Sequence, residues 1–331
     1  MAMDKSEHRN PVVIQKEGLS MRGQALFRPA AASVSNSKKM ISESKFAFLL
    51  LLPTIVILLG LLLYPFLYSI YLCFVDLNLT KPWVGPKFVG LDNFSAVLKD
   101  GEFWLSMETT LYFAVFSVAA SMILGLAAAL LFNIKFRMRG LGRSLLLIPW
   151  AMPGVVNAMI WQTMLHPNYG LLNGVLLKLG VIDSPVGWLS DPKLALASII
   201  MAQVWTSFPF VALMYLAALQ SISGELVEAA KIDGAGSIRI FKDIIVKLLV
   251  PVTLVLLVLR TIDSFRIFDL VFAMTKGGPA NSTQLSGLYL YKQGFMFSDF
   301  GLGSAGSYIL TGFILVFVLL YMRILRQKDG V

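Results

Sequence analysis

The feature that most constrains the fold is a series of apolar segments too long for a soluble protein. Phe46 to Val75 runs for 30 residues without Asp, Glu, Lys or Arg. A helix rises about 1.5 Å per residue, so this segment is long enough to cross a hydrocarbon core about 30 Å thick. Hydrophobic residues make up 57% of the chain and charged residues 14%, against about 25% charged in ordinary globular domains. These values argue against a soluble enzyme or a secreted disulfide scaffold.

Five further apolar segments follow the first. They cover residues 109–134, 144–165, 194–220, 248–274 and 300–322. Prolines interrupt several of them, among them Pro149 and Pro153 in the third. The pattern predicts an all-α integral membrane protein with six transmembrane helices.

The distribution of basic residues predicts which loops face the cytoplasm. Of the 28 Lys and Arg residues, 19 lie in residues 1–45, 135–143, 221–247 and 323–331, whereas seven lie in the alternating loops. Cytoplasmic loops carry such an excess of Lys and Arg. We therefore expect a multi-pass membrane protein with both termini in the cytoplasm. Residues 1–45 are expected to form a mostly disordered cytoplasmic tail, and nucleic-acid binding is not expected.

The sequence lacks the usual signatures of catalysis. It has no phosphate-binding G-x-x-x-x-G-K-[ST] loop, and His8, His166 and the single Cys73 cannot assemble a usual zinc site. Residues 301–306 fit G-x-G-x-x-G, but they follow no expected strand and begin the sixth segment. Close packing of helices by small residues explains them better. We expect no catalytic residue, no metal site and no cofactor in this chain.

The most informative loop lies between the fourth and fifth segments. Residues 225–232 suit a short helix, and Gly234 and Gly236 permit a sharp turn after it. Apolar residues then recur at helical spacing from Ile238 to Leu248, which predicts an amphipathic helix at the membrane surface. The expected structure is a helix–turn–helix with an alanine-rich tip.

This loop resembles the EAA loop of the membrane subunits of ATP-binding-cassette importers, most closely the type I sugar permeases that work with a periplasmic binding protein. The family pattern is E-A-A, three residues, Gly, nine residues, I-x-L-P. The matching residues are Glu228-Ala229-Ala230, Gly234 and Ile244. Val246 and Lys247 stand where the family has Leu-Pro, although Pro251 matches a second proline common one turn later.

Three other segments resemble the same permeases. They are residues 88–94 (FVGLDNF), residues 268–270 (FDL) with 275–283 (TKGGPANST), and Arg137 with residues 140–149. The resemblance covers about residues 46–325. It divides the chain into a tail (1–45), a first transmembrane helix with a periplasmic loop (46–108) and an ABC transporter type-1 transmembrane core (109–325).

The resemblance implies a location in the bacterial inner membrane and a defined set of partners. They are a second permease subunit, two copies of an ATPase subunit that binds ATP and Mg, a periplasmic or lipid-anchored solute-binding protein, and membrane lipid. The coupling (EAA) helix pair between spans four and five is expected to dock on the ATPase. The coupling residues are Glu228, Ala229, Ala230, Asp233 and Gly234.

The fifth segment carries four charged residues, which are costly inside a membrane unless paired or near water. Arg260 with Asp263 and Arg266 with Asp269 are both spaced i, i+3, at which local pairing is possible. Two interpretations remain open: a structural ladder of salt bridges facing the partner permease, or a lining of the solute path. The candidate path residues are Asn157, Trp161, Gln203, Trp205, Asp263, Arg266 and Asp269.

The function expected is ATP-driven import of a sugar or sugar derivative. The same machinery could import glycerol phosphate, for which Arg266 would be a suitable contact. An ion-coupled secondary transporter would use Asp263 and Asp269 to bind protons or cations. The EAA loop argues against it, because such a carrier has no ATPase to dock. A membrane enzyme would need a nucleophile, base or metal cluster, and none is recognisable.

Overall fold

The computed structural model describes residues 43–80, 83 and 85–326. The chain divides into two units, residues 1–57 and residues 58–331. In the first unit the described residues lie in α1 (Glu43–Leu58), an apolar helix with Pro53 inside it. None of the side chains described there is buried. The predicted tail, residues 1–45, lies almost entirely outside the described residues.

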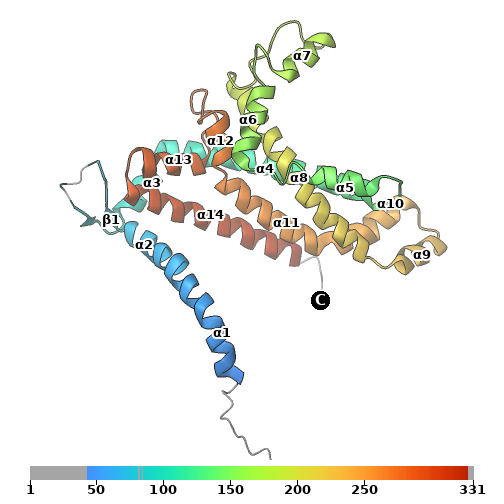
Figure 1. Ribbon diagram of the computed structural model, residues 1–331, viewed down its shortest axis with the longest axis horizontal. Helices are drawn as coiled ribbons and strands as arrows, with labels where there is room; N and C mark the ends of the chain where they lie inside the picture. The colour runs from blue at the N-terminus through green and yellow to red at the C-terminus, as the bar shows by residue number, and fades with distance from the viewer. Residues whose placement is uncertain (1–42, 81–82, 84, 327–331) are drawn as a thin grey trace, which may run out of the picture. The chain divides into compact units, whose positions relative to one another are not determined.

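The second unit is nearly all helical (Figure 1). Its elements in chain order are η1 (Leu59–Leu63), α2 (Tyr64–Leu72), β1 (Val75–Asp76), β2 (Lys87–Phe88), α3 (Asp92–Lys99), α4 (Gly101–Asn133), α5 (Arg139–Leu147), α6 (Gly154–Met164), α7 (Leu171–Lys178), α8 (Pro192–Ser221), α9 (Gly224–Ile232), α10 (Ser237–Ile240), η2 (Phe241–Ile245), α11 (Val246–Arg266), α12 (Asp269–Met274), α13 (Ser286–Tyr291), η3 (Lys292–Met296) and α14 (Phe300–Arg326).

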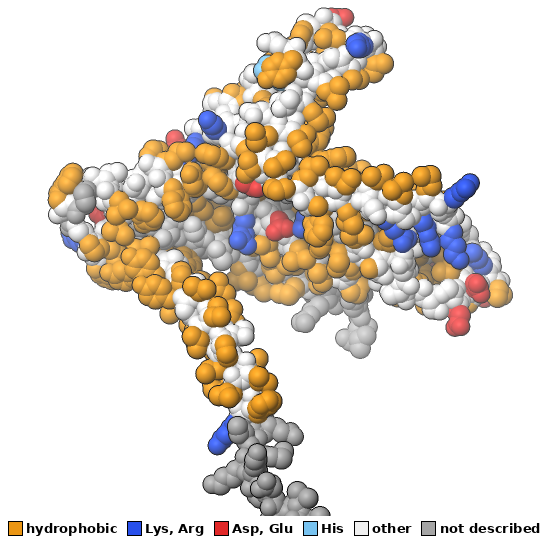
Figure 2. All heavy atoms as spheres, in the orientation of Figure 1, with side chains coloured by type: hydrophobic (Ala, Val, Ile, Leu, Met, Phe, Trp, Pro, Cys, Tyr) orange, Lys and Arg blue, Asp and Glu red, His pale blue; other side chains and the backbone are white. Residues whose placement is uncertain are grey.

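Five helices in the described part of the chain are long and apolar enough to cross a membrane. They are Lys45–Leu72, Gly101–Asn133, Pro192–Ser221, Ser237–Arg266 and Phe300–Arg323. Many large apolar side chains on them are exposed, as expected of helices that face lipid (Figure 2). The prediction of a helical membrane protein is confirmed, whereas the count of six crossings stays a prediction.

Helices α4 and α8 pack against each other along most of their length, and α11 and α14 lie beside them (Figure 1). Gly125 of α4 permits the close approach: a Cβ there would lie 2.5 Å from Cγ1 of Val211 on α8.

Helix α4 begins at Gly101, eight residues before the predicted start at Thr109. The Asp100 side chain caps it by accepting a hydrogen bond from the Glu102 N–H at 2.8 Å.

The third predicted span is not one helix. Residues 144–165 fall into α5 and α6, which are separated by a turn at residues 148–153. Pro149 and Pro153 lie in this turn. Because proline lacks an N–H and clashes with the preceding turn, two prolines four residues apart end one helix and begin another.

The fifth predicted span, residues 248–274, has different boundaries in the structure. One continuous helix runs from Ser237 to Arg266, so the expected amphipathic surface helix does not bend away from the span. Lys247 replaces the proline of the family pattern, and Pro251 lies within the helix. The helix ends at Arg266 because Ile267 is extended (ψ 129°), and α12 follows as a separate element.

The sixth span begins at Phe300 as predicted. Its glycines serve helix packing, which confirms the interpretation of residues 301–306. A Cβ on Gly301 would lie 2.5 Å from the Val75 carbonyl oxygen, and one on Gly306 would lie 2.5 Å from Leu290. These glycines therefore allow α14 to approach β1 and α13 closely.

The described residues of the connections after α2 and α6 also form regular contacts. Strands β1 and β2 pair antiparallel between α2 and α3. After α6, the side chain of Asn173 on α7 is 2% exposed and joins three parts of the loop. It donates hydrogen bonds to the carbonyls of Pro167 and Val186, and it accepts from the Val186 N–H and the Trp188 indole.

Candidate functional site

The predicted helix–turn–helix is present as α9, a turn at residues 233–236, and α10. Helix α9 covers Gly224–Ile232, against the predicted 225–232. It ends in a Schellman motif. The Ala235 N–H donates a hydrogen bond to the Ala230 carbonyl at 2.9 Å, and the Gly234 N–H donates one to the Lys231 carbonyl at 3.0 Å. Gly234 has φ of +79°, which favours glycine, whereas Gly236 has φ of −70° and suits any residue.

Most side chains at the tip of this hairpin are exposed, including two large apolar ones. Glu228, Ala229, Asp233 and Gly234 are exposed, and Ala230 is half-buried against the inner side. Ile232 and Ile238 flank the turn and are 86% and 84% exposed. Lys and Arg side chains gather at the end of the second unit that carries α9 and α10 (Figure 2). An exposed apolar pair beside basic residues is typical of a surface that binds another protein.

A polar cavity of about 380 Å³ lies where four helices meet. Its lining comes from the turn before α6, from α6 and α8, and from the α11–α12 break: Met152, Gly154, Asn157, Gln203, Thr206, Asp263, Arg266, Ile267, Asp269 and Leu270. Five of the seven predicted path residues line it, namely Asn157, Gln203, Asp263, Arg266 and Asp269. Hydrogen-bonding groups from three separate sequence regions therefore converge on one space.

The two predicted tryptophans do not line this cavity. Trp161 packs against the core that surrounds Phe113 and Ile199. Trp205 is 45% exposed and lies beside Phe208, with 6.2 Å between the ring centroids. A helix turns each residue about 100° from the last, so Trp205, two residues after Gln203, points away from it. The place of the two tryptophans in a solute path stays a prediction.

The amides in the cavity are partly held by the protein. Asn157 is 2% exposed and donates to the carbonyl of Ala202 at 3.3 Å. Gln203 donates to the hydroxyl of Ser207 at 3.1 Å. These bonds use one amide N–H donor of each side chain and leave its carbonyl oxygen as an acceptor.

The four charges of the fifth segment do not form the expected ladder. Arg260 pairs with Asp263, with 2.8 Å between Nη2 and Oδ2, as predicted. Within the described residues, Arg266 and Asp269 form no ion pair. The helix ends at Arg266, so the helical i, i+3 geometry that would bring Arg266 and Asp269 together is lost. Arg266 and Asp269 are both exposed to the cavity instead.

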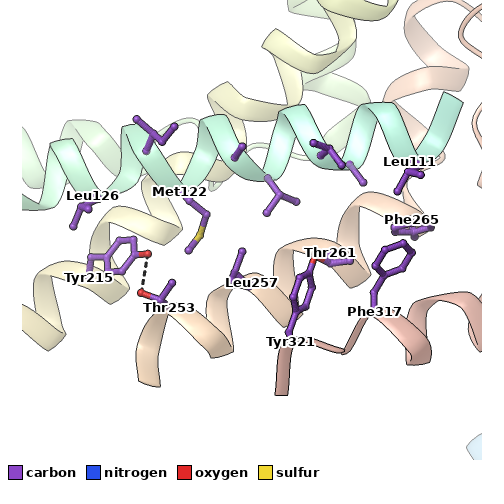
Figure 3. A pocket seen from close by; sticks show the side chains of 15 residues that line it. Leu111, Met122, Leu126, Tyr215, Thr253, Leu257, Thr261, Phe265, Phe317 and Tyr321 are labelled. Carbon is purple, nitrogen blue, oxygen red and sulfur yellow. Dashed lines mark hydrogen bonds between the residues drawn. The ribbon is translucent and has the colours of Figure 1, made fainter. Parts of the chain in front are cut away.

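A second cavity, of about 410 Å³, has a different character. It lies between α4, α8, α11 and α14 and is lined mostly by apolar side chains such as Leu111, Met122 and Phe317 (Figure 3). Its hydroxyls bond each other: Tyr215 with Thr253 at 3.1 Å, and Thr261 with Tyr321 at 3.4 Å. With few free polar groups, this cavity does not suit a hydrophilic solute.

Comparison with known proteins identifies the family. Residues 121–328 match the family described as "Binding-protein-dependent transport system inner membrane component". The chain belongs to this family. Such an inner membrane component is a multi-pass membrane subunit of a larger transport system, as the apolar helices require.

Two relatives of this inner membrane component are named as permease proteins of transport systems. It is 39% identical to the trehalose/maltose transport system permease protein MalF of Thermococcus litoralis, over 88% of this chain and 97% of that protein. It is 36% identical to the sulfoquinovosyl glycerol transport system permease protein SmoG of Agrobacterium fabrum, over 87% and 93% of the two chains.

Solved structures share the fold. A bacterial ABC transporter involved in import of the acidic polysaccharide alginate matches with a TM-score of 0.74 and 24% identity, over 85% of this chain and 95% of that chain. The same transporter in complex with an alginate pentasaccharide-bound periplasmic protein matches equally well, with a TM-score of 0.74 and 24% identity, over 86% and 96% of the two chains.

Sequence reasoning missed several residues of the cavity in this inner membrane component. Met152 and Gly154 lie at the break between α5 and α6, and Thr206 lies one turn after Gln203 on α8. Thr206 could have been found from its i, i+3 spacing to Gln203. Gly154 has no polar side chain, so its position directly after Pro153 is the one sequence feature that could have suggested it as a cavity residue.

Proposed function

We propose that this chain is the permease subunit of an ATP-driven, binding-protein-dependent importer for a sugar or sugar derivative. Two relatives that match almost the whole chain are named as permeases for trehalose/maltose and for sulfoquinovosyl glycerol. The polar cavity, with amide, carboxylate and guanidinium groups, suits a solute that carries several hydroxyls. ATP hydrolysis belongs to a separate subunit, and this chain performs no chemistry.

One observation carries the proposal: a single helix joins the two candidate sites. Ser237 begins the helix directly after the exposed turn, and the same helix ends at Arg266 in the cavity. At about 1.5 Å per residue, its 30 residues span about 45 Å. A force applied to the turn therefore reaches the cavity through one continuous element, which is the connection that an ATP-driven transporter needs.

The proposal includes a membrane arrangement. Helices α5 and α6 together make the third of six crossings, and their broken middle lies beside the solute path. Irregular backbone at membrane depth is tolerated where it lines a water-filled cavity. The end with α9 and α10 faces the cytoplasm, in agreement with its basic residues, and both termini lie on that side.

The partners follow from the same arrangement. A second permease subunit completes the pathway, and two ATPase subunits bind ATP and Mg and receive the coupling helices. Glu228, Ala229, Ala230, Asp233 and Gly234 form the docking tip, and Ile232 and Ile238 add an apolar anchor on either side of the turn. A periplasmic or lipid-anchored binding protein delivers the solute.

The alternative solute is glycerol phosphate or another small polar compound. Arg266 is exposed to the cavity and has no ion-pair partner within the described residues, so its charge is available to an anion. Two carboxylates share the cavity with it, which favours a neutral polyhydroxy solute over an anion.

The experiment purifies the tagged chain from its own membranes in mild detergent and identifies the subunits that remain bound. The complex is then reconstituted in liposomes with its binding protein, and sugar uptake and ATP hydrolysis are measured together. An ATPase subunit bound to the chain, with uptake that depends on ATP, is the expected result. A chain that retains no ATPase contradicts the proposal.

A matched pair of substitutions tests the coupling tip. Gly234→Val places a branched side chain at φ of +79°, whereas Gly236→Val adds the same atoms two residues away at φ of −70°. A left-handed conformation costs an L-residue about 1–2 kcal/mol or more. We expect Gly234→Val to lower uptake about tenfold while ATP hydrolysis continues, and Gly236→Val to retain most uptake. Normal uptake in Gly234→Val contradicts the assignment.

A further inference from the structure

Gly154 and Asp269, which both line the polar cavity, are in close contact. A Cβ built on Gly154 would overlap Oδ2 of Asp269 and would lie only 2.6 Å from its Cγ. The three atoms nearest to that Cβ position all belong to the Asp269 carboxyl group. The carboxylate thus rests directly on the backbone of Gly154, in space that any other residue would fill.

The elements on both sides explain why the carboxylate lies there. Gly154 is the first residue of α6, and Asp269 is the first residue of α12, which packs against α6. Pro153 occupies the capping position of α6 and supplies no side-chain hydrogen bond. The first N–H groups of α6 therefore lack a capping side chain, and the positive end of the helix dipole favours a nearby carboxylate.

The same carboxylate remains open to the cavity. Asp269 is exposed, lines the cavity with Asn157 and Gln203, and makes no ion pair or side-chain hydrogen bond within the described residues. One side of the carboxylate contacts Gly154, so the rotation of the side chain is restricted. The other side faces the space where a solute would lie, and an ionised carboxylate there accepts hydrogen bonds only.

We propose that Gly154 is a positioning residue that holds the Asp269 carboxylate in the orientation in which it accepts hydrogen bonds from hydroxyl groups of the transported solute. This inference rests on the proposed function and deepens it, because it assigns the solute contact to Asp269 and its geometry to a residue without a side chain. The chemical class of solute is a neutral compound with neighbouring hydroxyl donors.

The test is a double-mutant cycle in the reconstituted complex. Uptake of radiolabelled maltose and trehalose is measured for the wild type, with the anionic sulfoquinovosyl glycerol as a charged comparison whose preferred uptake would overturn the neutral class. KM and the maximal rate are then determined for the better of the two neutral sugars. Loss of one hydrogen bond to a charged group corresponds to about tenfold or more in affinity. We expect Gly154→Ala to raise KM by about that factor with a nearly unchanged maximal rate.

The second arm separates positioning from simple crowding. Asp269→Ala removes the contact and is expected to raise KM by a similar factor. Because the carboxyl group is then gone, Gly154→Ala in the Asp269→Ala background should change KM no further. Gly140→Ala is the matched control, since Gly140 lies in α5, on the other side of the break before α6, and a Cβ there meets no atom within 4 Å.

The outcomes are distinguishable. A wild-type KM in Gly154→Ala, or an additional rise when Gly154→Ala is added to Asp269→Ala, overturns the inference. If Gly154→Ala alone does not assemble, its assembly in the Asp269→Ala background supports the inference, and failure in both backgrounds overturns it. If Gln203→Ala and Arg266→Ala also leave KM unchanged, or no sugar is taken up by the wild type, the proposed function of the cavity fails instead.

Discussion

Replacing Asp263 by alanine should destabilise the protein more than replacing its partner, Arg260. The Arg260 side chain is 14% exposed, whereas that of Asp263 is 51% exposed. The guanidinium contacts Asp263 at 2.8 Å and lies over the ring of Phe210, 5.1 Å from its centroid. Its Nε is buried and has no hydrogen-bond partner among the residues that the structure describes. Asp263 is therefore the main compensation for a largely buried positive charge.

The magnitude follows from these exposures. Breaking a fully buried pair from one side costs about 3–5 kcal/mol, and an exposed pair is worth about 0.2–1 kcal/mol. Asp263 is half exposed and the cavity is polar, so Asp263→Ala should cost about 1–3 kcal/mol. An unfolding entropy of about 2.1 cal/mol/K per residue over 331 residues converts this to about 1–4 °C in the unfolding midpoint. Arg260→Met removes the buried charge itself and leaves Asp263 near water, so it should cost less.

The assay is thermal unfolding of the purified protein in lipid nanodiscs at a single scan rate, because membrane proteins often unfold irreversibly. The two single variants and the Arg260→Met/Asp263→Ala double variant are compared. The double variant should be about as stable as Arg260→Met and more stable than Asp263→Ala. Equal losses from both single variants, or additive losses in the double variant, would refute the view that Arg260 is a buried charge stabilised by Asp263.

Two further predictions concern packing and the loop after α6. Gly125→Ala places a Cβ 2.5 Å from Cγ1 of Val211, which is fully buried; this overpacking should cost about 1–3 kcal/mol, and adding Val211→Ala should restore the unfolding midpoint. No recovery in that double variant would contradict the contact. Asn173→Ala leaves the Trp188 N–H, now bonded at 2.9 Å, and the Val186 N–H without acceptors, which costs about 1–3 kcal/mol for each group that stays buried. Limited proteolysis should then cut residues 166–191 faster while the spanning helices keep their midpoint, and an unchanged cleavage rate would show that Asn173 does not hold the loop.

The helices that span the membrane could be predicted because hydropathy alone determines them. The fourth and sixth spans begin within two residues of their predicted starts, at Pro192 and Phe300. The end of the fifth could not be found in this way, since every residue from Ile267 to Met274 except Asp269 is apolar. The break depends on packing: a Cβ on Gly287 of α13 would lie 2.7 Å from the carbonyl oxygen of Ile267. Only the absence of that Cβ lets the backbone leave the helix there.

The cavity was partly predictable for a similar reason. A polar side chain in an apolar segment is costly unless it meets water or a partner, so Asn157, Gln203 and Asp269 were visible as candidates. Which of them share a space depends on the relative rotation of α6, α8 and α11, and sequence does not give that rotation. Trp161 and Trp205 carry the chemistry of a sugar site, yet one packs in the core and the other lies outside the cavity lining.

The break at Ile267 also separates the two charges that sequence spacing would have paired. Arg266 is the last residue of the long helix that begins at the exposed turn. Asp269 is the first residue of α12, and its carboxylate contacts Gly154. The two charges therefore belong to different elements. If the long helix transmits the movement of the coupling tip, as proposed, Arg266 moves with it while Asp269 stays with α6. The separation of a guanidinium and a carboxylate inside the cavity then changes with the position of the tip, and solute affinity changes with it. An unbroken helix to Met274 would have kept Arg266 and Asp269 as a fixed i, i+3 pair, and the cavity would have lost this response.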